Sequence, residues 1–303
     1  MMAMTTANQA GACRKPFVEA TGLPIGMQLF PLMAQLRDDL ARTLGRIGAI
    51  GYEMVETAGL LGYDAHEFRA ALDAAGLTCG GMHVQAQSPF GPGQNLTDDI
   101  DAVIADARVL GTRQIVMPLF FFPDNLCAPA DATPGEKIRL AAAALGPSDY
   151  RRMADFLNAK GRYLSERDMR LSYHNHNAEF APQDGSTGME MLLELTDPDH
   201  VDFELDIGWA AAAGADIPSL LEAHEGRFTQ MHVKDIAPTT RSNYVFCQDP
   251  ARIGHGVINF ARVLPLAYQA GVRSYYIEQE APFTGDPIDS FEANYHALTA
   301  ITV

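Results

Sequence analysis

The chain has 303 residues, of which 47% are hydrophobic and 20% charged, as is usual for a globular protein with a large core. Its net charge of −16 argues against nucleic acid or an anionic membrane as a partner, because binding a polyanion needs a basic face. No apolar run is long enough to span a bilayer, and Cys13, Cys79, Cys127 and Cys247 form no C-x-x-C pair, so free thiols in the cytoplasm are expected.

Residues 1–24 contain no apolar signal-peptide core and are expected to form a loose N-terminal arm. From residue 25 onward, short β-branched runs alternate with amphipathic segments. The runs predict strands at 25–30, 51–58, 77–84, 113–117, 170–176, 201–208, 228–235 and 272–280. The intervening segments predict helices near 34–48, 64–75, 97–110, 148–168, 188–196, 217–224, 259–270 and 288–301, the third beginning with Thr97 and the fourth capped by Ser148.

Eight βα units in alternation favour one parallel (β/α)8 TIM barrel over residues 25–303. The rival, an open doubly wound sheet, needs a glycine-rich phosphate turn after its first strand, and the segment QLFPLMAQ has none. Glycines before strands, Gly51 and Gly111 among them, suit helix C-caps. The long connection 118–147 after the fourth strand predicts a lid, a binding loop or a subunit contact, with Phe120 to Phe122 partly exposed unless covered.

Polar residues gather where the predicted strands end, which is the edge that carries the chemistry in such barrels. In chain order they are Gln28, Glu56, His83, His174 and His176, Asp206, His232 and Lys234, and Glu278 and Glu280. His174 and His176 are two residues apart, so in an extended strand they face the same side. This many polar strand ends at one level indicate a functional site.

Four of these residues, His174, Asp206, His232 and Glu278, could meet on the barrel axis from the last four strands. Two imidazoles and two carboxylates form a borderline ligand set for one divalent cation. The set favours Mn²⁺, with Zn²⁺, Co²⁺ and Fe²⁺ as alternatives; Mg²⁺ prefers an all-oxygen shell but stays in consideration.

Several stretches between residue 26 and about residue 280 carry a family resemblance, namely GMQLFPL, GYEMVETAG, YHNHNAEF, FELDIGW, MHVKD, RIGHGVINF and YYIEQE. In combination they resemble the sugar phosphate isomerase/epimerase family, the xylose isomerase-like TIM barrels. The resemblance implies a divalent metal held by one residue each from strands five to eight. Asp206, His232 and Glu278 match the last three positions.

The strand-five position departs from the family, in which well-studied members carry glutamate. Here the matching residue is His174, with His176 and Glu179 as alternatives. The family's epimerases use two ligand glutamates as opposed proton acceptors. Only Glu278 of that pair is retained, so a symmetric two-base epimerisation is in doubt.

The remaining candidate residues each have a structural alternative. Glu278, Glu179 or His176 would move the proton, and Lys234 would hold a substrate oxygen or polarise a carbonyl, unless it forms a salt bridge with Asp235 or Glu204. The candidate substrate-binding residues are Glu56, His83, the only tryptophan Trp209, and His255, which stands between two glycines where family members often carry an acid.

These observations predict a metal-dependent isomerase or epimerase that acts on a keto-sugar or polyol through an enediolate. A lyase or hydrolase that cleaves 3-keto-glycosides by β-elimination is the alternative, because it shares that intermediate. An apurinic endonuclease would need more histidine ligands and a basic face, and a non-catalytic sugar-binding barrel is less favoured. The expected partner is a small sugar or glycoside, and a homo-oligomer is left open.

Overall fold

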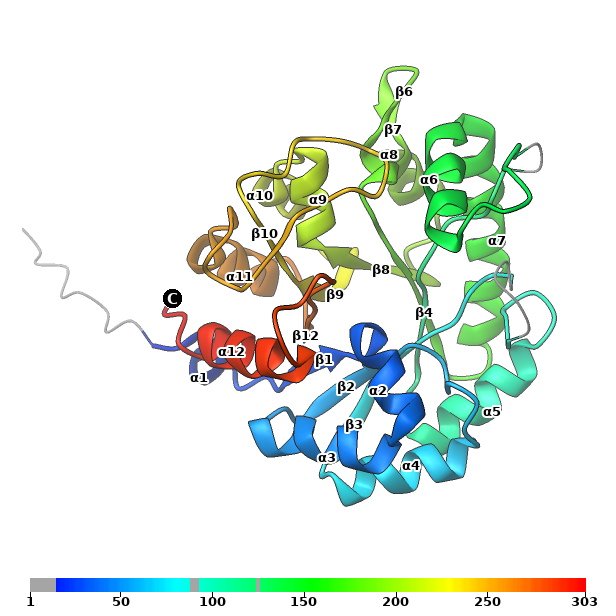
Figure 1. The fold of residues 1–303 in the computed structure, drawn as a ribbon. Coiled ribbons are helices and arrows are strands. Elements are labelled where there is room, and N and C mark those ends of the chain that lie inside the picture. The colour runs from blue at the N-terminus through cyan, green and yellow to red at the C-terminus, as the bar shows by residue number, and fades with distance from the viewer. Residues whose placement is uncertain (1–14, 88–92, 124–125) are drawn as a thin grey trace, which may run out of the picture.

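The computed structural model describes residues 15–87, 93–123 and 126–303 and shows a closed barrel with helices around it (Figure 1). All neighbouring barrel strands are parallel, and the last pairs with the first. The predicted (β/α)8 barrel is therefore confirmed. Its strands are β1 (Ile25–Gln28), β2 (Met54–Thr57), β3 (Thr78–His83), β4 (Gln114–Met117), β5 (Arg170–His174), β8 (Val201–Asp206), β9 (Phe228–Val233) and β12 (Ser274–Ile277).

Helices surround the barrel and connect its strands (Figure 1). They are α1 (Phe17–Thr21), α2 (Met33–Asp38), α3 (Leu40–Ile50), α4 (Ala65–Ala74), α5 (Ile100–Leu110), α6 (Pro134–Ala144), α7 (Pro147–Ser165), α8 (Gly188–Leu195), α9 (Ile207–Ala213), α10 (Ile217–Ala223), α11 (Phe260–Gln269) and α12 (Pro287–Thr299). The loops contain two short antiparallel strand pairs, β6 (Pro182–Gln183) with β7 (Ser186–Thr187) and β10 (Asp235–Ile236) with β11 (Pro250–Ala251).

Alternation along each strand separates an apolar shell from a polar interior. The outward side chains pack under the helices and are fully buried; they include Met27, Val55, Ile115, Leu171, Phe203, Leu205, Met231, Val233 and Ile277. The inward set includes Gln28, Glu56, Ser172, Glu204 and Gln230, all buried. The barrel interior near the carboxyl-terminal ends of the strands is therefore lined by polar side chains and is not an apolar core.

Three local expectations are wrong. The loose arm does not extend over residues 15–24, because Phe17 is buried and its N–H donates to the Ile301 carbonyl; residues 1–14 lie outside the described part. Ser148 lies inside α7, which is capped at Gly146. Thr97 precedes α5, because the Asn95 side chain accepts the Thr97 and Asp98 N–H groups and delays the helix to Ile100.

The connection after β4 contains α6, which the sequence did not predict. Its start carries a capping box, in which Thr133 and Glu136 satisfy each other's backbone N–H groups. Phe120 is buried, and Phe121 packs edge-on against Phe156 of α7. Phe121 and Phe122 are only partly buried, so the run is covered at Phe120 and partly exposed at the other two positions. Within the described residues, no helix is both long and apolar enough to cross a membrane.

Candidate functional site

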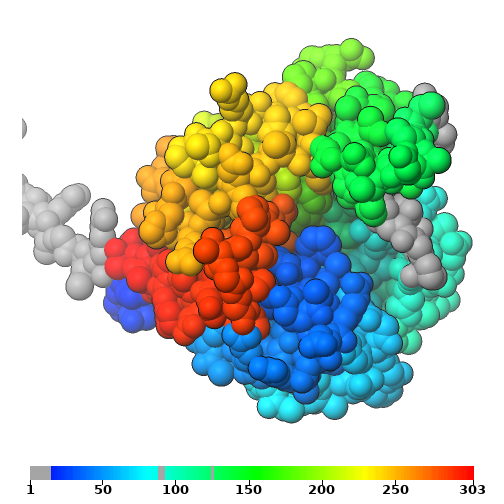
Figure 2. All heavy atoms as spheres, in the orientation of Figure 1, coloured from blue at the N-terminus to red at the C-terminus, as the bar shows by residue number. Residues whose placement is uncertain are grey.

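Three predicted ligands converge at the carboxyl-terminal ends of β8, β9 and β12. Asp206, His232 and Glu278 each place one ligand atom within 4.8 Å of the others, and all three side chains are buried. His232 Nδ1 lies 3.1 Å from Glu278 Oε2 and 3.7 Å from Asp206 Oδ2. Figure 2 shows a hollow in this face of the barrel, between the segment that follows β12, the turn after β1 and α6.

The DIGW stretch explains how Asp206 is presented. Asp206 caps α9, and its Oδ1 accepts the Trp209 N–H at 2.8 Å, which leaves Oδ2 facing the site. Gly208 allows Lys234 to run past this helix, because a Cβ at Gly208 would lie 2.7 Å from Lys234 Cγ and Cδ. One short turn thereby positions a carboxylate and admits a lysine beside it.

Lys234 is buried among three carboxylates. Its Nζ lies 2.7 Å from Glu278 Oε2, 2.9 Å from Asp206 Oδ2 and 3.0 Å from Glu280 Oε1. Burial lowers the pKa of Lys234, but attraction to these carboxylates outweighs it and raises the pKa well above its usual value. The side chain is therefore an ammonium ion.

The structural alternative for Lys234, a salt bridge to Asp235 or Glu204, is wrong, because its partners are Asp206, Glu278 and Glu280. The Asp235 carboxylate instead accepts the backbone N–H groups of Gly254, Gly256 and Ile258, and so fixes the RIGHGVINF loop. His255, on that loop, is exposed and is in neither group of possible metal ligands. Its role as a substrate contact stays a prediction.

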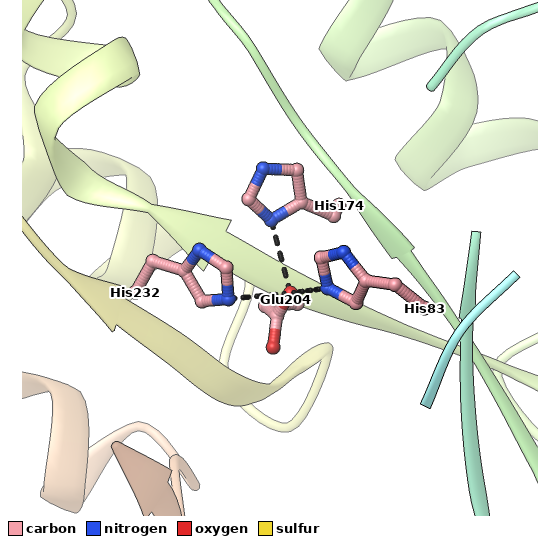
Figure 3. Close-up of side chains that lie close together, drawn as sticks. All are labelled: His83, His174, Glu204 and His232. Carbon is pink, nitrogen blue, oxygen red and sulfur yellow. Dashed lines mark hydrogen bonds and ion pairs between the residues drawn. The ribbon is translucent and has the colours of Figure 1, made fainter. Parts of the chain in front are cut away.

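His232 also belongs to a second group of possible metal ligands, which includes His83, His174 and Glu204. The imidazoles of His83, His174 and His232 converge on one oxygen of Glu204, at 3.1, 2.9 and 3.1 Å (Figure 3). Glu204 was missed as a site residue, although the stretch FELD places it two residues before Asp206 and hence on the same face of β8.

Glu56 supports the same histidines from β2. Its Oε2 lies 2.7 Å from His232 Nε2 and 2.9 Å from His83 Nε2, and it accepts a hydrogen bond from Gln28 Nε2 at 2.6 Å. Both Glu56 and His83 were predicted to contact substrate. Glu56 is fully buried, so its position suits a residue that orients His232.

The histidines carry different charges. Burial lowers the pKa of His83, but Glu56 and Glu204 raise it to about 9, and the same balance with Glu204 raises the pKa of His232 well above its usual range. Burial, with repulsion from His232, lowers the pKa of His174 to about 3. The negative charge of the buried carboxylates is therefore balanced by the protonated His83 and His232 and by the Lys234 ammonium. A bound metal cation can also balance this charge.

The donor set fits a divalent metal. His174 Nδ1 is held by Glu204 and His232 Nε2 by Glu56, so a cation would use His174 Nε2 or His232 Nδ1, and His232 Nδ1 instead contacts Glu278 Oε2 at 3.1 Å. Asp206 Oδ2 is buried and accepts no hydrogen bond, although the Lys234 ammonium faces it as an ion pair. The fourth ligand stays a prediction, since His174 groups with Glu204 and not with Asp206 and Glu278.

The two alternatives to His174 point elsewhere. His176 stacks on Phe246, with ring centroids 4.5 Å apart and planes at 25°, and belongs to neither ligand group. Glu179 accepts hydrogen bonds from the Tyr173 hydroxyl and the His176 N–H. Tyr173 faces the outer side of β5, so Glu179 supports the backbone behind the site and does not reach the reacting groups.

Glu179 makes stability depend on pH. Burial raises its pKa from 4.5 to about 7, although the Tyr173 hydroxyl opposes the shift. Because the folded-state pKa is raised, this group stabilises the fold below pH 4.5, and the contribution, about 3 kcal/mol, is lost as pH rises to about 7. We expect Glu179→Gln to flatten this part of the urea-unfolding profile. An unchanged wild-type slope in the variant would contradict the assignment.

Glu56→Gln is expected to weaken metal binding by about 10- to 100-fold, because the amide is a poorer acceptor for the His232 imidazole. Competition with a fluorescent chelator measures the Mn²⁺ affinity. Glu53→Gln is the matched control, since Glu53 is exposed and lies just before the same strand. Equal affinity in the two variants would show that Glu56 does not orient a ligand.

The closed parallel barrel is a TIM barrel, and buried histidines and carboxylates at its carboxyl end form a candidate metal site. The sequence profile of the xylose isomerase-like TIM barrel family matches residues 44–295, and the chain belongs to this family. The predicted resemblance is thus confirmed.

Solved structures share the fold at low identity. A sugar phosphate isomerase/epimerase from Parabacteroides distasonis superposes with a TM-score of 0.67 at 22% identity, over 99% of this chain and 98% of that one. The 3-keto-D-glucoside 4-epimerase of E. coli gives 0.62 at 16% over 91% and 98%. A xylose isomerase-like TIM barrel protein from Mycobacterium smegmatis, in complex with magnesium, gives 0.56 at 15% over 92% and 96%.

Curated relatives match over part of the chain. An inosose dehydratase of Mesomycoplasma hyopneumoniae is 34% identical over 88 residues, which is 29% of each chain. An inosose dehydratase of Salmonella typhimurium is 27% identical over 92 residues, again 29% of each chain. The chain therefore matches less than a third of the length of these relatives.

Proposed function

We propose that the protein is a divalent-metal-dependent isomerase or epimerase that acts on a keto-sugar or polyol through an enediolate. The observation that carries the proposal is the convergence of Asp206, His232 and Glu278 beside the buried Lys234. The relatives' names support it, because an inosose and a 3-keto-glucoside are both ketones, and dehydration and epimerisation can both begin with loss of the proton next to the carbonyl.

When bound, the metal would polarise the substrate carbonyl and acidify the neighbouring C–H bond. Mn²⁺ remains our expectation for its identity. Burial raises the pKa of Glu278, but Lys234 and His232 outweigh burial and hold it well below its usual range, so Glu278 is an ionised base. Its carboxylate takes the α-proton, the electron pair moves to the carbonyl oxygen, and the Lys234 ammonium stabilises the charge on that oxygen. Return of the proton to the adjacent carbon, together with transfer of the neighbouring hydroxyl proton to the former carbonyl oxygen, gives the isomer.

Deuterium exchange tests this proposal. The protein with Mn²⁺ is incubated in D₂O with a panel of ketoses, and mass spectrometry follows incorporation at the α-carbon, with a chelator-treated sample as control. We expect metal-dependent wash-in for at least one ketose. A protein that binds no Mn²⁺ and exchanges no proton would overturn the proposal and leave a sugar-binding barrel.

The lyase alternative is favoured by one contact, the 2.7 Å between Lys234 Nζ and Glu278 Oε2, which places an acid next to the base. Glu278 would take the α-proton of a 3-keto-glycoside, the bond from carbon to the aglycone oxygen would break, and the departing oxygen would take a proton from Lys234. Release of p-nitrophenol from a p-nitrophenyl 3-keto-glucoside identifies this reaction. Cytoplasmic location and homo-oligomerisation stay predictions.

A further inference from the structure

An aromatic cluster adjoins the candidate metal site. Phe246 stands at its centre, with ring centroids 4.5 Å from His176, 5.5 Å from Trp209 and 5.7 Å from Phe120. Trp209 lies next to the candidate metal site. Its backbone N–H donates to Asp206, and Lys234 Nζ lies 5.2 Å from the centroid of its ring. We call His176, Trp209 and Phe246 the aromatic wall.

Phe246 is held in place at a conformational cost. It lies in the loop between β10 and β11, which passes over α9 in Figure 1, where Ser242 donates to the Ala213 carbonyl. Its φ of 56° is unusual for a bulky residue, and such strain concentrates at functional sites. Asn177 Oδ1 accepts the Phe246 N–H at 3.0 Å, and Asn177 Nδ2 donates to Asn243 Oδ1 at 2.8 Å, so the segment after β5 fixes the loop.

The wall also contains polar atoms without partners. Trp209 Nε1 and His176 Nδ1 are both buried and make no hydrogen bond. An unsatisfied buried polar group costs about 1–3 kcal/mol, so a wall that served packing alone would be better built from phenylalanine or leucine. His176 and Phe246 are only partly buried, which leaves part of the wall accessible.

We propose that the aromatic wall selects cyclic substrates, and that Phe246 determines this specificity. A pyranose or cyclitol ring has an apolar C–H surface, which packs against aromatic side chains, and the half-buried His176 and Phe246 are the parts of the wall that such a ring can reach. An acyclic ketose can present the same hydroxy-ketone to the metal site but lacks the rigid apolar surface. This inference rests on the proposed function, whose reaction alone would be compatible with either kind of substrate.

Binding is measurable without activity, because Trp209 is the only tryptophan in the chain. Fluorescence titrations of the Mn²⁺-loaded protein use methyl 3-keto-glucopyranoside as the cyclic probe and erythrulose as the acyclic probe. Phe246→Gly removes the ring and relaxes the backbone, since glycine adopts a φ near 56° freely. Val245→Ala is the matched control, because Val245 is the exposed neighbour in the same loop.

The wild type is expected to bind the cyclic probe at least about tenfold more tightly than the acyclic probe, and Phe246→Gly to lose about tenfold in affinity for the cyclic probe alone. Turnover of a bound cyclic substrate should change less than its KM. Wild-type discrimination retained in Phe246→Gly, or none in the wild type, would overturn the inference. If ketoses exchange deuterium but the protein binds the cyclic and acyclic probes equally well, the inference fails and the proposed function stands. If binding of the cyclic probe depends on Phe246 but no ketose exchanges deuterium, the inference stands and the proposed function fails.

Discussion

Glu278→Gln should lower turnover by about 10²–10⁴-fold, because the amide cannot accept the α-proton. Glu278 combines two roles in the proposed reaction: its Oε2 lies 3.1 Å from His232 Nδ1 within the ligand group, and 2.7 Å from Lys234 Nζ. The loss should appear in kcat and in deuterium exchange alike. Mn²⁺ affinity, measured in parallel by chelator competition, separates a lost ligand from a lost base.

Glu280→Gln provides the control for this variant. Glu280 follows on the same segment and also contacts Lys234, but it belongs to neither ligand group, and its side chain is 28% exposed. We expect a change of less than about tenfold, as for a partly solvated ion pair. If Glu280→Gln abolished exchange and Glu278→Gln did not, the base would be Glu280 and the proposed assignment would be wrong.

The barrel and three of its candidate ligands could be predicted because they depend on short-range patterns. The alternation of side chains along the strands places Asp206, His232 and Glu278 at the carboxyl-terminal edge of the barrel, and this position does not depend on the conformation of the loops. The interior network was less accessible. The convergence of His83 from β3 with Glu204 from β8 depends on how the closed barrel brings non-adjacent strands face to face, which no local pattern encodes.

Loop residues were harder still to place. Glu179 follows β5 by five residues, and the short 3₁₀ turn Ala178–Phe180 directs its carboxylate to Tyr173, behind the site. Phe246 gave no signal at all, because its position depends on the asparagine pair Asn177 and Asn243, which join segments distant in sequence. Tertiary hydrogen bonds decide such positions, and a single sequence does not show them.

Lys234 competes with the metal for the same carboxylates. Its ammonium lies 2.9 Å from Asp206 Oδ2 and 2.7 Å from Glu278 Oε2, the two carboxylate oxygens expected to bind the cation. In the absence of metal, Lys234→Met leaves both buried carboxylates without this counter-ion. Breaking a buried ion pair in this way costs about 3–5 kcal/mol, so the variant should unfold at clearly lower urea concentration in the presence of a chelator.

Mn²⁺ should reverse much of that loss. Removing a positive charge a few ångströms from the cation strengthens its binding, and we expect Lys234→Met to bind Mn²⁺ at least about tenfold more tightly than the wild type. Turnover should nevertheless fall, because the ammonium that stabilises the developing oxyanion is gone. Lys160→Met on α7 is the control, because Lys160 donates to the Thr97 carbonyl and lies over the Phe156 ring, away from the site. Weaker Mn²⁺ binding by Lys234→Met would mean that the cation does not bind between Asp206 and Glu278, since only there does the ammonium oppose it.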